Sequence, residues 1–105
     1  MATFNIKTGD TRPVLAKPTG VNLANAVEVR MIARTAVRGA KVIDAVMTID
    51  PDPTTGIAYY TWSAADSTTA YTGLVLEFQI IFADGGTQTV PADSYDVLNI
   101  NADLS

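Results

Sequence analysis

Apolar and polar residues alternate along the stretch Leu74–Gly86, LVLEFQIIFADGG. The apolar residues occupy every second position, at Leu74, Leu76, Phe78, Ile80 and Phe82. Side chains alternate between the two faces of a strand, whereas a helix would spread these five around its circumference. The pattern therefore predicts one long strand with a continuous apolar face, and we expect the rest of the chain to be arranged around it.

The segment Asp84-Gly85-Gly86 follows this strand at once. Asp-Gly tolerates the positive φ that a tight turn requires, so the segment predicts a hairpin. The return strand is expected at Thr87–Val90, where Pro91 stops it. Phe78 lies in the middle of the apolar face and is predicted to belong to the core.

The segment Ala26–Arg34 fits two interpretations. As a helix it could be capped by Asn22 and Gly39, with three arginines stacked at i, i+4 spacing. As a strand it leaves only Ile32 misplaced, and it is therefore favoured. The strand would turn one set of side chains inward and another outward: Val27, Val29, Met31 and Ala33 inward, Glu28, Arg30 and Arg34 outward.

Further alternating segments predict a β fold throughout the chain. Lys41–Asp50 has two faces, with Ile43, Ala45, Met47 and Ile49 on one and Val42, Asp44, Val46 and Thr48 on the other. Shorter strands are expected at Thr3–Lys7, Pro13–Lys17, Ile57–Trp62 and near Tyr95–Asn101, with a single helical turn or a tight loop at Ser63–Thr68. Short strands at even spacing indicate an all-β protein. The expected fold is an antiparallel immunoglobulin-like β-sandwich of seven to nine short strands, in a single domain over residues 1–105.

Two features could carry a ligand. Asp50 and Asp52 lie in a loop rich in turn-forming residues, which fits a hairpin connection better than a calcium loop because the terminal Glu is missing. Trp62 lies among aromatic residues and is interpreted as a core side chain; the alternative is a platform for a ligand.

The composition argues against an enzyme. The 105 residues include no histidine, which is the commonest general base, and no cysteine. No cofactor, metal or catalytic residue is therefore expected. The N-terminus lacks the pattern of a signal peptide, and no apolar run approaches the roughly 20 residues that span a bilayer, so no membrane partner is expected.

Charge is distributed unevenly along the chain. All seven basic residues lie within the first 41 residues, and nine of the eleven acids follow them. One interpretation is solvated surface; another is a basic patch on one copy that meets an acidic patch on the next. Nucleic-acid binding is not expected, because no aromatic or glycine-rich binding motif accompanies the basic residues.

A contact surface for a partner can be suggested from these patterns. Its candidate residues are Arg30, Arg34, Arg38, Val42 and Val46. The carboxylates expected to face them on another chain are Asp93, Asp96 and Asp103. The strands near Pro13 and Tyr95 are the expected sheet edges, where unpaired backbone groups favour association.

The motifs resemble, in their order, the N-terminal immunoglobulin-like domain of the baseplate upper protein family of tailed phages. Ile6–Leu15 is similar to its opening I-x-x-G-D-T-x-P-x-L, and Val21–Ala26 to its V-D-L-T-G-A turn. The later matches are Tyr60–Ser67 to Y-x-W-T-A-A-D-T, Glu77–Gly85 to E-F-x-V-x-F-A-D-G, Val90-Pro91 to F-P, and Val97–Leu104 to V-x-I-x-x-D-L. The match departs at Tyr71–Leu74, where the family has Gly-x-Tyr.

The resemblance implies a non-enzymatic structural protein of the virion, made in the host cytoplasm, whose partners are other virion proteins or further copies of itself. The family's longer C-terminal part does not follow Ser105, so the resemblance implies the attachment module alone, on the tail or baseplate. Decoration of the capsid or neck is an alternative. A carbohydrate-binding module is an alternative of another class, suggested by residues that could stack on sugars: Tyr59, Tyr60, Trp62 and Tyr71.

Overall fold

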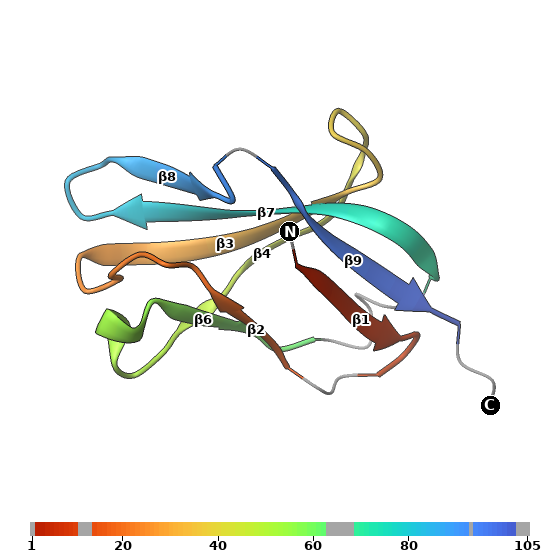
Figure 1. The fold of residues 1–105 in the computed structure, drawn as a ribbon, viewed down its shortest axis with the longest axis horizontal. Helices are drawn as coiled ribbons and strands as arrows, with labels where there is room; N and C mark the ends of the chain where they lie inside the picture. Colours follow the sequence, from red (N-terminus) through yellow and green to blue (C-terminus); the bar gives the residue numbers. More distant parts are fainter. Residues whose placement is uncertain (1, 11–13, 63–68, 93, 103–105) are drawn as a thin grey trace.

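The predicted organising strand is the longest in the structure. In the computed structural model, which describes residues 2–10, 14–62, 69–92 and 94–102, it forms β7, Tyr71–Phe82 (Figure 1). The other strands are β1 Thr3–Lys7, β2 Leu15–Pro18, β3 Ala26–Arg34, β4 Lys41–Val46, β5 Thr48–Ile49, β6 Ile57–Tyr60, β8 Thr87–Val90 and β9 Asp96–Asn101. A 3-10 turn, η1, covers Pro53–Thr55.

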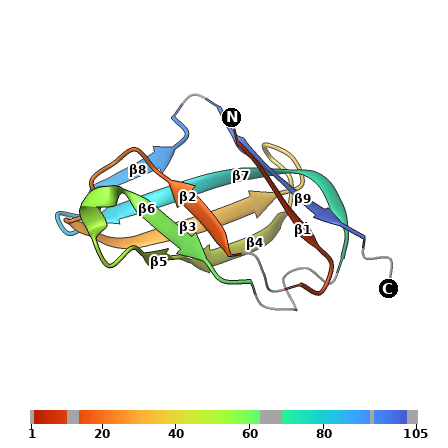
Figure 2. The same ribbon diagram turned by 60° about the horizontal axis from the view of Figure 1, so that its bottom comes forward.

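The strands form two sheets that lie one over the other (Figure 2). The large sheet has the order β1-β9-β7-β3-β4, with β8 also paired to β7, and the small sheet has the order β2-β6-β5. β3 runs along one side of β7, while β9 and β8 lie end to end along the other, opposite Tyr71–Leu76 and Phe78–Ile81. The expected all-β, immunoglobulin-like sandwich is therefore confirmed, and β7 is its central strand.

The hairpin after β7 forms as the sequence predicts. Gly85 has a φ of 87°, and the Phe82 N–H donates to the Gly86 carbonyl at 2.9 Å. The Asp84 carboxylate accepts from the Gly86 N–H at 2.7 Å and holds the turn. The return strand β8 has the predicted bounds, Thr87–Val90.

The segment Lys41–Asp50 changes sheets partway along. It was expected to be one strand, but β4 belongs to the large sheet and β5 to the small one. The change occurs at Met47, whose N–H still donates to the Val29 carbonyl at 2.7 Å. The following loop is the expected hairpin connection between β5 and β6. Its Asp52 caps η1, and Gly56 closes it with a φ of 72°.

Side chains that alternate on the strands fill the space between the sheets. On β7 the inward positions are Leu74, Leu76, Phe78 and Ile80, and all four are buried. They pack with residues from both sheets, including Met31, Ile43, Tyr60, Trp62, Leu98 and Ile100. The predicted core positions of Phe78 and Trp62 are therefore confirmed.

The segment Ala26–Arg34 is a strand, as favoured, but one of its inward positions was predicted wrongly. Val29, Met31 and Ala33 are buried, whereas Val27 is 64% exposed. The cause is a bulge: Ala26 pairs with Phe82 and Glu28 pairs with Ile81, so Val27 is an extra residue that faces solvent.

The expected sheet edges were half right. β2 is an edge of the small sheet, although Pro13 itself lies outside the described residues. β9 was expected at an edge but lies between β7 and β1, and β1 pairs with it in parallel. The segment Ser63–Thr68, expected to be a single helical turn or a tight loop, also lies outside the described part of the chain.

Candidate partner-contact surface

The outer face of β3 and β4 carries most of the predicted contact residues. Arg30 lies opposite Val46, and Ile32 lies opposite Asp44. Residues directly opposite each other in an antiparallel pair project to the same face, and here that face points away from the core. Arg30 and Val46 are therefore neighbours on the outer surface of the large sheet.

Arg30 is already paired within its own chain. Its Nη1 donates to Asp44 Oδ1 at 2.8 Å, and its Nε donates to Glu28 Oε2 at 3.3 Å. Lys41 Nζ binds the second Asp44 oxygen at 3.1 Å. The hydrogen bonds from Arg30 and then Lys41 lower the pKa of the Asp44 carboxyl, and the bond to Asp44 raises the pKa of Arg30. The charges of the two halves of the sequence thus meet within one molecule.

Arg34 is the last residue of β3, and Arg38 lies in the loop between β3 and β4. Arg34 Nη1 donates to the Gly39 carbonyl at 2.9 Å, so this side chain holds the loop in place. The loop is closed further by the Thr35 N–H, which donates to the Ala40 carbonyl at 3.1 Å. Arg38 is exposed near the tip and has no hydrogen-bond or ion-pair partner among the described residues. Arg30 therefore forms ion pairs on the sheet, Arg34 supports the loop, and Arg38 is exposed near the tip of the loop.

The two predicted valines also differ. Val46 is 54% exposed on the outer face, beside Arg30. Val42 is half-buried and packs against the core, at an irregularity where Arg34 pairs with Lys41 and Ala33 with Ile43. The extra residue turns Val42 away from the position that simple alternation predicts. Of the two, Val46 offers more surface to a partner.

The acidic partner expected at Asp96 is not at the surface. Asp96 is 1% exposed, and its Oδ2 accepts from Lys17 Nζ at 2.7 Å. Its other oxygen accepts from the Ala2 N–H at 2.9 Å. Its expected pairing with arginines of another chain is therefore wrong, because a carboxylate buried in its own sandwich cannot reach one. Asp93 and Asp103 lie outside the described residues.

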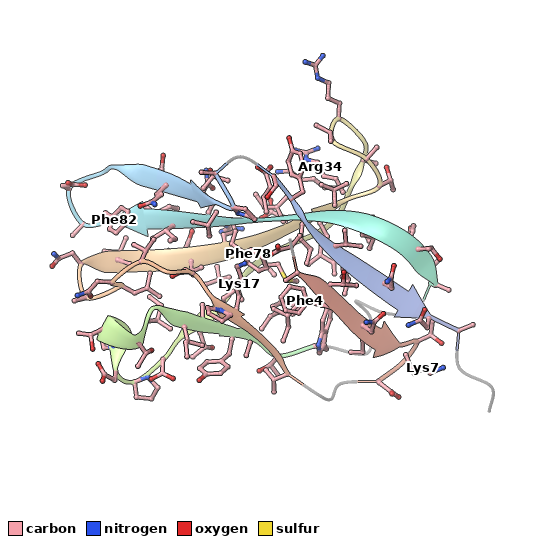
Figure 3. The ribbon with its side chains drawn as sticks, viewed as in Figure 1. Phe4, Lys7, Lys17, Arg34, Phe78 and Phe82 are labelled. Carbon is pink, nitrogen blue, oxygen red and sulfur yellow. The ribbon has the colours of Figure 1, made fainter. Side chains whose placement is uncertain are left out.

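Sequence reasoning missed the pair formed by Lys17 and Asp96. Lys17 occupies an inward position of β2, and its ammonium lies 5.3 Å from the centre of the Phe78 ring. Phe4 contacts the same ring edge-on, with 6.4 Å between ring centres. Figure 3 shows Lys17 and Phe4 next to Phe78. A signal was present in the alternation of Leu15, Lys17 and Thr19, which places a lysine on the buried face.

The aromatic residues suggested as a platform for sugars make contacts within the chain. Trp62 is 4% exposed and contacts Tyr60 edge-to-face, with 5.0 Å between ring centres. The Tyr59 hydroxyl donates to Asp50 Oδ2 at 2.7 Å, and Tyr71 packs against the core. Burial of the single tryptophan argues against stacking on a carbohydrate, which requires an exposed ring.

The loop aspartates hold the backbone. Asp50 accepts from the Asp52 N–H at 2.9 Å, and Asp52 accepts from the Thr54 N–H at 3.2 Å. The hydrogen bond from Tyr59 lowers the pKa of Asp50, and Asp50 in turn raises the pKa of Tyr59. Within the described ranges, no group of three or more acidic side chains is placed to hold a metal ion.

One small cavity lies away from this surface. Its volume is about 100 Å³, and six residues line it. They come from β1, from the start of β2 with Val14 just before it, and from Trp62, which follows β6. The lining side chains are apolar except for Asn5, so the cavity presents no acid, base or nucleophile.

Comparison with known proteins shows no family for this chain. No protein-family model and no curated protein matches this chain. In the part of the chain that the structure describes, no helix has the length and apolar character to cross a membrane.

Proposed function

We propose that this chain is a non-enzymatic structural protein of a tailed-phage virion that attaches to the tail or baseplate. The observation that carries the proposal is the order of the sequence motifs along an immunoglobulin-like sandwich. The Gly9-Asp10 turn follows β1, Val21–Ala26 leads into β3, and Glu77–Gly85 spans the end of β7 and its hairpin. The baseplate upper protein family has similar motifs in the same order.

The outer surface of the β3–β4 hairpin supports attachment to a neighbouring protein. We call it the hairpin surface and define it by exposed residues at its two ends: Val37 and Arg38 in the loop, and Val46 at the other end of β4, opposite Arg30. Exposed ion pairs contribute only about 0–1 kcal/mol each, so Arg38 would orient a contact that the valines stabilise. Weak contacts of this kind suffice when many copies bind one particle, because binding is then multivalent.

The partners in this proposal are other virion proteins or further copies of the chain. Arg30 is a weaker candidate for the contact than Arg38, because a partner would have to break the ion pairs that Arg30 forms with Asp44 and Glu28. Within the described ranges of the chain, Arg38 has no such contact to lose. The proposed localisation is the virion, after synthesis in the host cytoplasm.

The test is immunogold electron microscopy of particles purified on a density gradient from cells that produce the chain. Label at the tail or baseplate is expected. Label over the capsid or at the neck would instead favour the decoration role. Particles free of label, with the protein left in the soluble fraction, would contradict a virion role altogether.

A further inference from the structure

The small sheet has an open edge at β2. Its order is β2-β6-β5, and no other described strand pairs with β2. The corresponding sheet of a constant-type immunoglobulin domain has four strands. The position beside β2 is therefore where a fourth strand of this sheet would lie.

The backbone of β2 offers hydrogen bonds at this edge. The Thr19 N–H donates to the Gly56 carbonyl at 2.8 Å, which continues the register of Lys17 with Ala58. In an antiparallel pair, positions that bond to the neighbour alternate with positions that point away from it. The N–H and C=O of Ala16 therefore point away from β6. Pro18, the next such position, supplies only its carbonyl.

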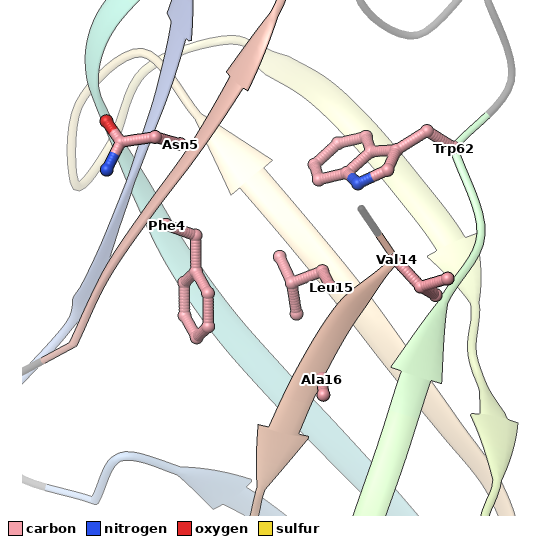
Figure 4. A pocket seen from close by; sticks show the side chains of 6 residues that line it. All are labelled: Phe4, Asn5, Val14, Leu15, Ala16 and Trp62. Carbon is pink, nitrogen blue, oxygen red and sulfur yellow. The ribbon is translucent and has the colours of Figure 1, made fainter. Parts of the chain in front are cut away.

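A cavity opens next to the same edge (Figure 4). It has a volume of about 100 Å³. Phe4 and Asn5 of β1 line one side, Val14, Leu15 and Ala16 line the other, and Trp62 closes it. A strand laid beside β2 would pass the cavity with one side chain turned inward, because successive side chains of a strand point to opposite faces.

We propose that β2 binds an extended segment of another protein, which adds to the small sheet as its fourth strand. The backbone of the segment pairs with Ala16, and an uncharged aliphatic side chain opposite Leu15 fills the cavity. This is recognition by β-strand addition, in which the backbone supplies affinity and the pocket supplies specificity. The aliphatic choice follows from the lining, which holds no charged side chain.

The β2 strand of a second copy does not meet these requirements. Its inward side chains are already used: Leu15 is buried in its own core, and Lys17 binds Asp96. The proposed occupant is instead an arm of a partner protein, whose inward side chain is not packed in a domain of its own. This inference does not depend on the proposed virion role, since it concerns the chemistry of the edge alone.

The test uses the whole chain and a synthetic peptide, KTTLTTK, capped at both ends. At millimolar concentration the peptide is expected to shift the Ala16 amide signal, slow its hydrogen exchange, and give contacts between its leucine methyls and the ring of Trp62, the only tryptophan. The control peptide KTTDTTK replaces the leucine by aspartate. It should bind about tenfold more weakly or not at all, because a carboxylate cannot be buried in an apolar cavity.

Two variants check the geometry. Ala16→Pro removes the outward N–H and should abolish binding while the sandwich still folds, since an edge strand tolerates proline where its N–H faces away. If Ala16→Pro does not fold, Val14→Lys, at an exposed position that lines the cavity, decides by the same loss of binding. Three results would overturn the proposal: no saturable binding, equal binding of both peptides, or protection of Ala16 by a dimer in the absence of peptide.

Discussion

Lys17 on β2 and Asp96 on β9 join the two sheets through an ion pair of 2.7 Å inside the sandwich. The side chains are 12% and 1% exposed, so both charges are largely removed from water. Such a pair is retained only when further contacts satisfy it. Here the Ala2 N–H donates to Asp96, and the Phe78 ring lies below the ammonium. The pair therefore fixes how the N-terminal strand, β2 and β9 meet.

Removal of one partner should be strongly destabilising. Lys17→Met leaves a buried carboxylate without its cation, and we expect a loss of about 3–5 kcal/mol in the free energy of unfolding. Urea denaturation measures the loss. The double variant Lys17→Met/Asp96→Asn removes both charges and keeps an acceptor for the Ala2 N–H, so it should recover much of the stability. A wild-type midpoint for Lys17→Met would show that the pair is unimportant.

Phe78 should be among the most costly side chains to truncate. It is buried in the middle of β7 and contacts both Phe4 and Lys17. Phe78→Ala should cost roughly 3–5 kcal/mol, a large part of a total stability of about 5–15 kcal/mol. Thermal unfolding followed by circular dichroism gives the answer. A melting temperature within a few degrees of wild type would mean that β7 is not central to stability.

The bulge at the start of β3 predicts opposite results for two nearby valines. Val29 is buried, so Val29→Ala should cost about 2 kcal/mol, whereas Val27 is exposed and Val27→Ala should stay within about 0.5 kcal/mol. Chemical denaturation of the two variants side by side tests the register. Equal losses would place both side chains in the core, as simple alternation predicts.

These bulges also mark what the sequence could not reveal. The long alternation of β7 and the Asp84-Gly85 turn were enough to predict the central strand and its hairpin, because both depend on local sequence. Val27 and Val42 lie where a strand gains one extra residue, and that choice depends on the neighbouring strand. Lys17 is an inward lysine that is tolerated only because Asp96, 79 residues further on, meets it.

The candidate contact surface was predictable in outline only. The strand interpretation placed Arg30 and Val46 on the outer face, where they lie. It could not show that Arg30 pairs with Asp44, or that Arg34 binds the Gly39 carbonyl, because both contacts depend on the register of β4 and the path of its loop. Of the three arginines, Arg38 is the one that contacts no partner in the described part of the chain, so its side chain could bind another protein.

The stability that the hydrogen bond between Tyr59 and Asp50 contributes should be lost at both acidic and alkaline pH. The hydrogen bond from Tyr59 lowers the Asp50 pKa from 3.8, so its contribution to stability is present above that value and is lost as pH falls through the lowered pKa. The Tyr59 pKa is raised from 10.0, so that contribution is present below 10.0 and is lost as pH rises through the raised pKa. In Asp50→Asn the tyrosinate absorbance of Tyr59 should appear at lower pH than in wild type. Tyr59→Phe identifies its signal, and an unchanged titration in Asp50→Asn would disprove the contact.

Charge reversal at the loop tip tests the hairpin surface. A triple reversal of the three arginines would be ambiguous, because glutamate at position 30 would face Glu28 and Asp44, and position 34 holds the loop. Arg38→Glu is the cleaner variant: its exposed side chain has no partner among the described residues, so the free energy of unfolding should change by less than about 0.5 kcal/mol. Incorporation into particles at physiological salt, measured by quantitative immunoblot, should fall.

Lys7→Glu is the matched control, since Lys7 is an exposed cation on β1 at the opposite edge of the large sheet, and its reversal should leave incorporation unchanged. Equal incorporation of wild type and Arg38→Glu would mean that the loop tip is ordinary solvated surface.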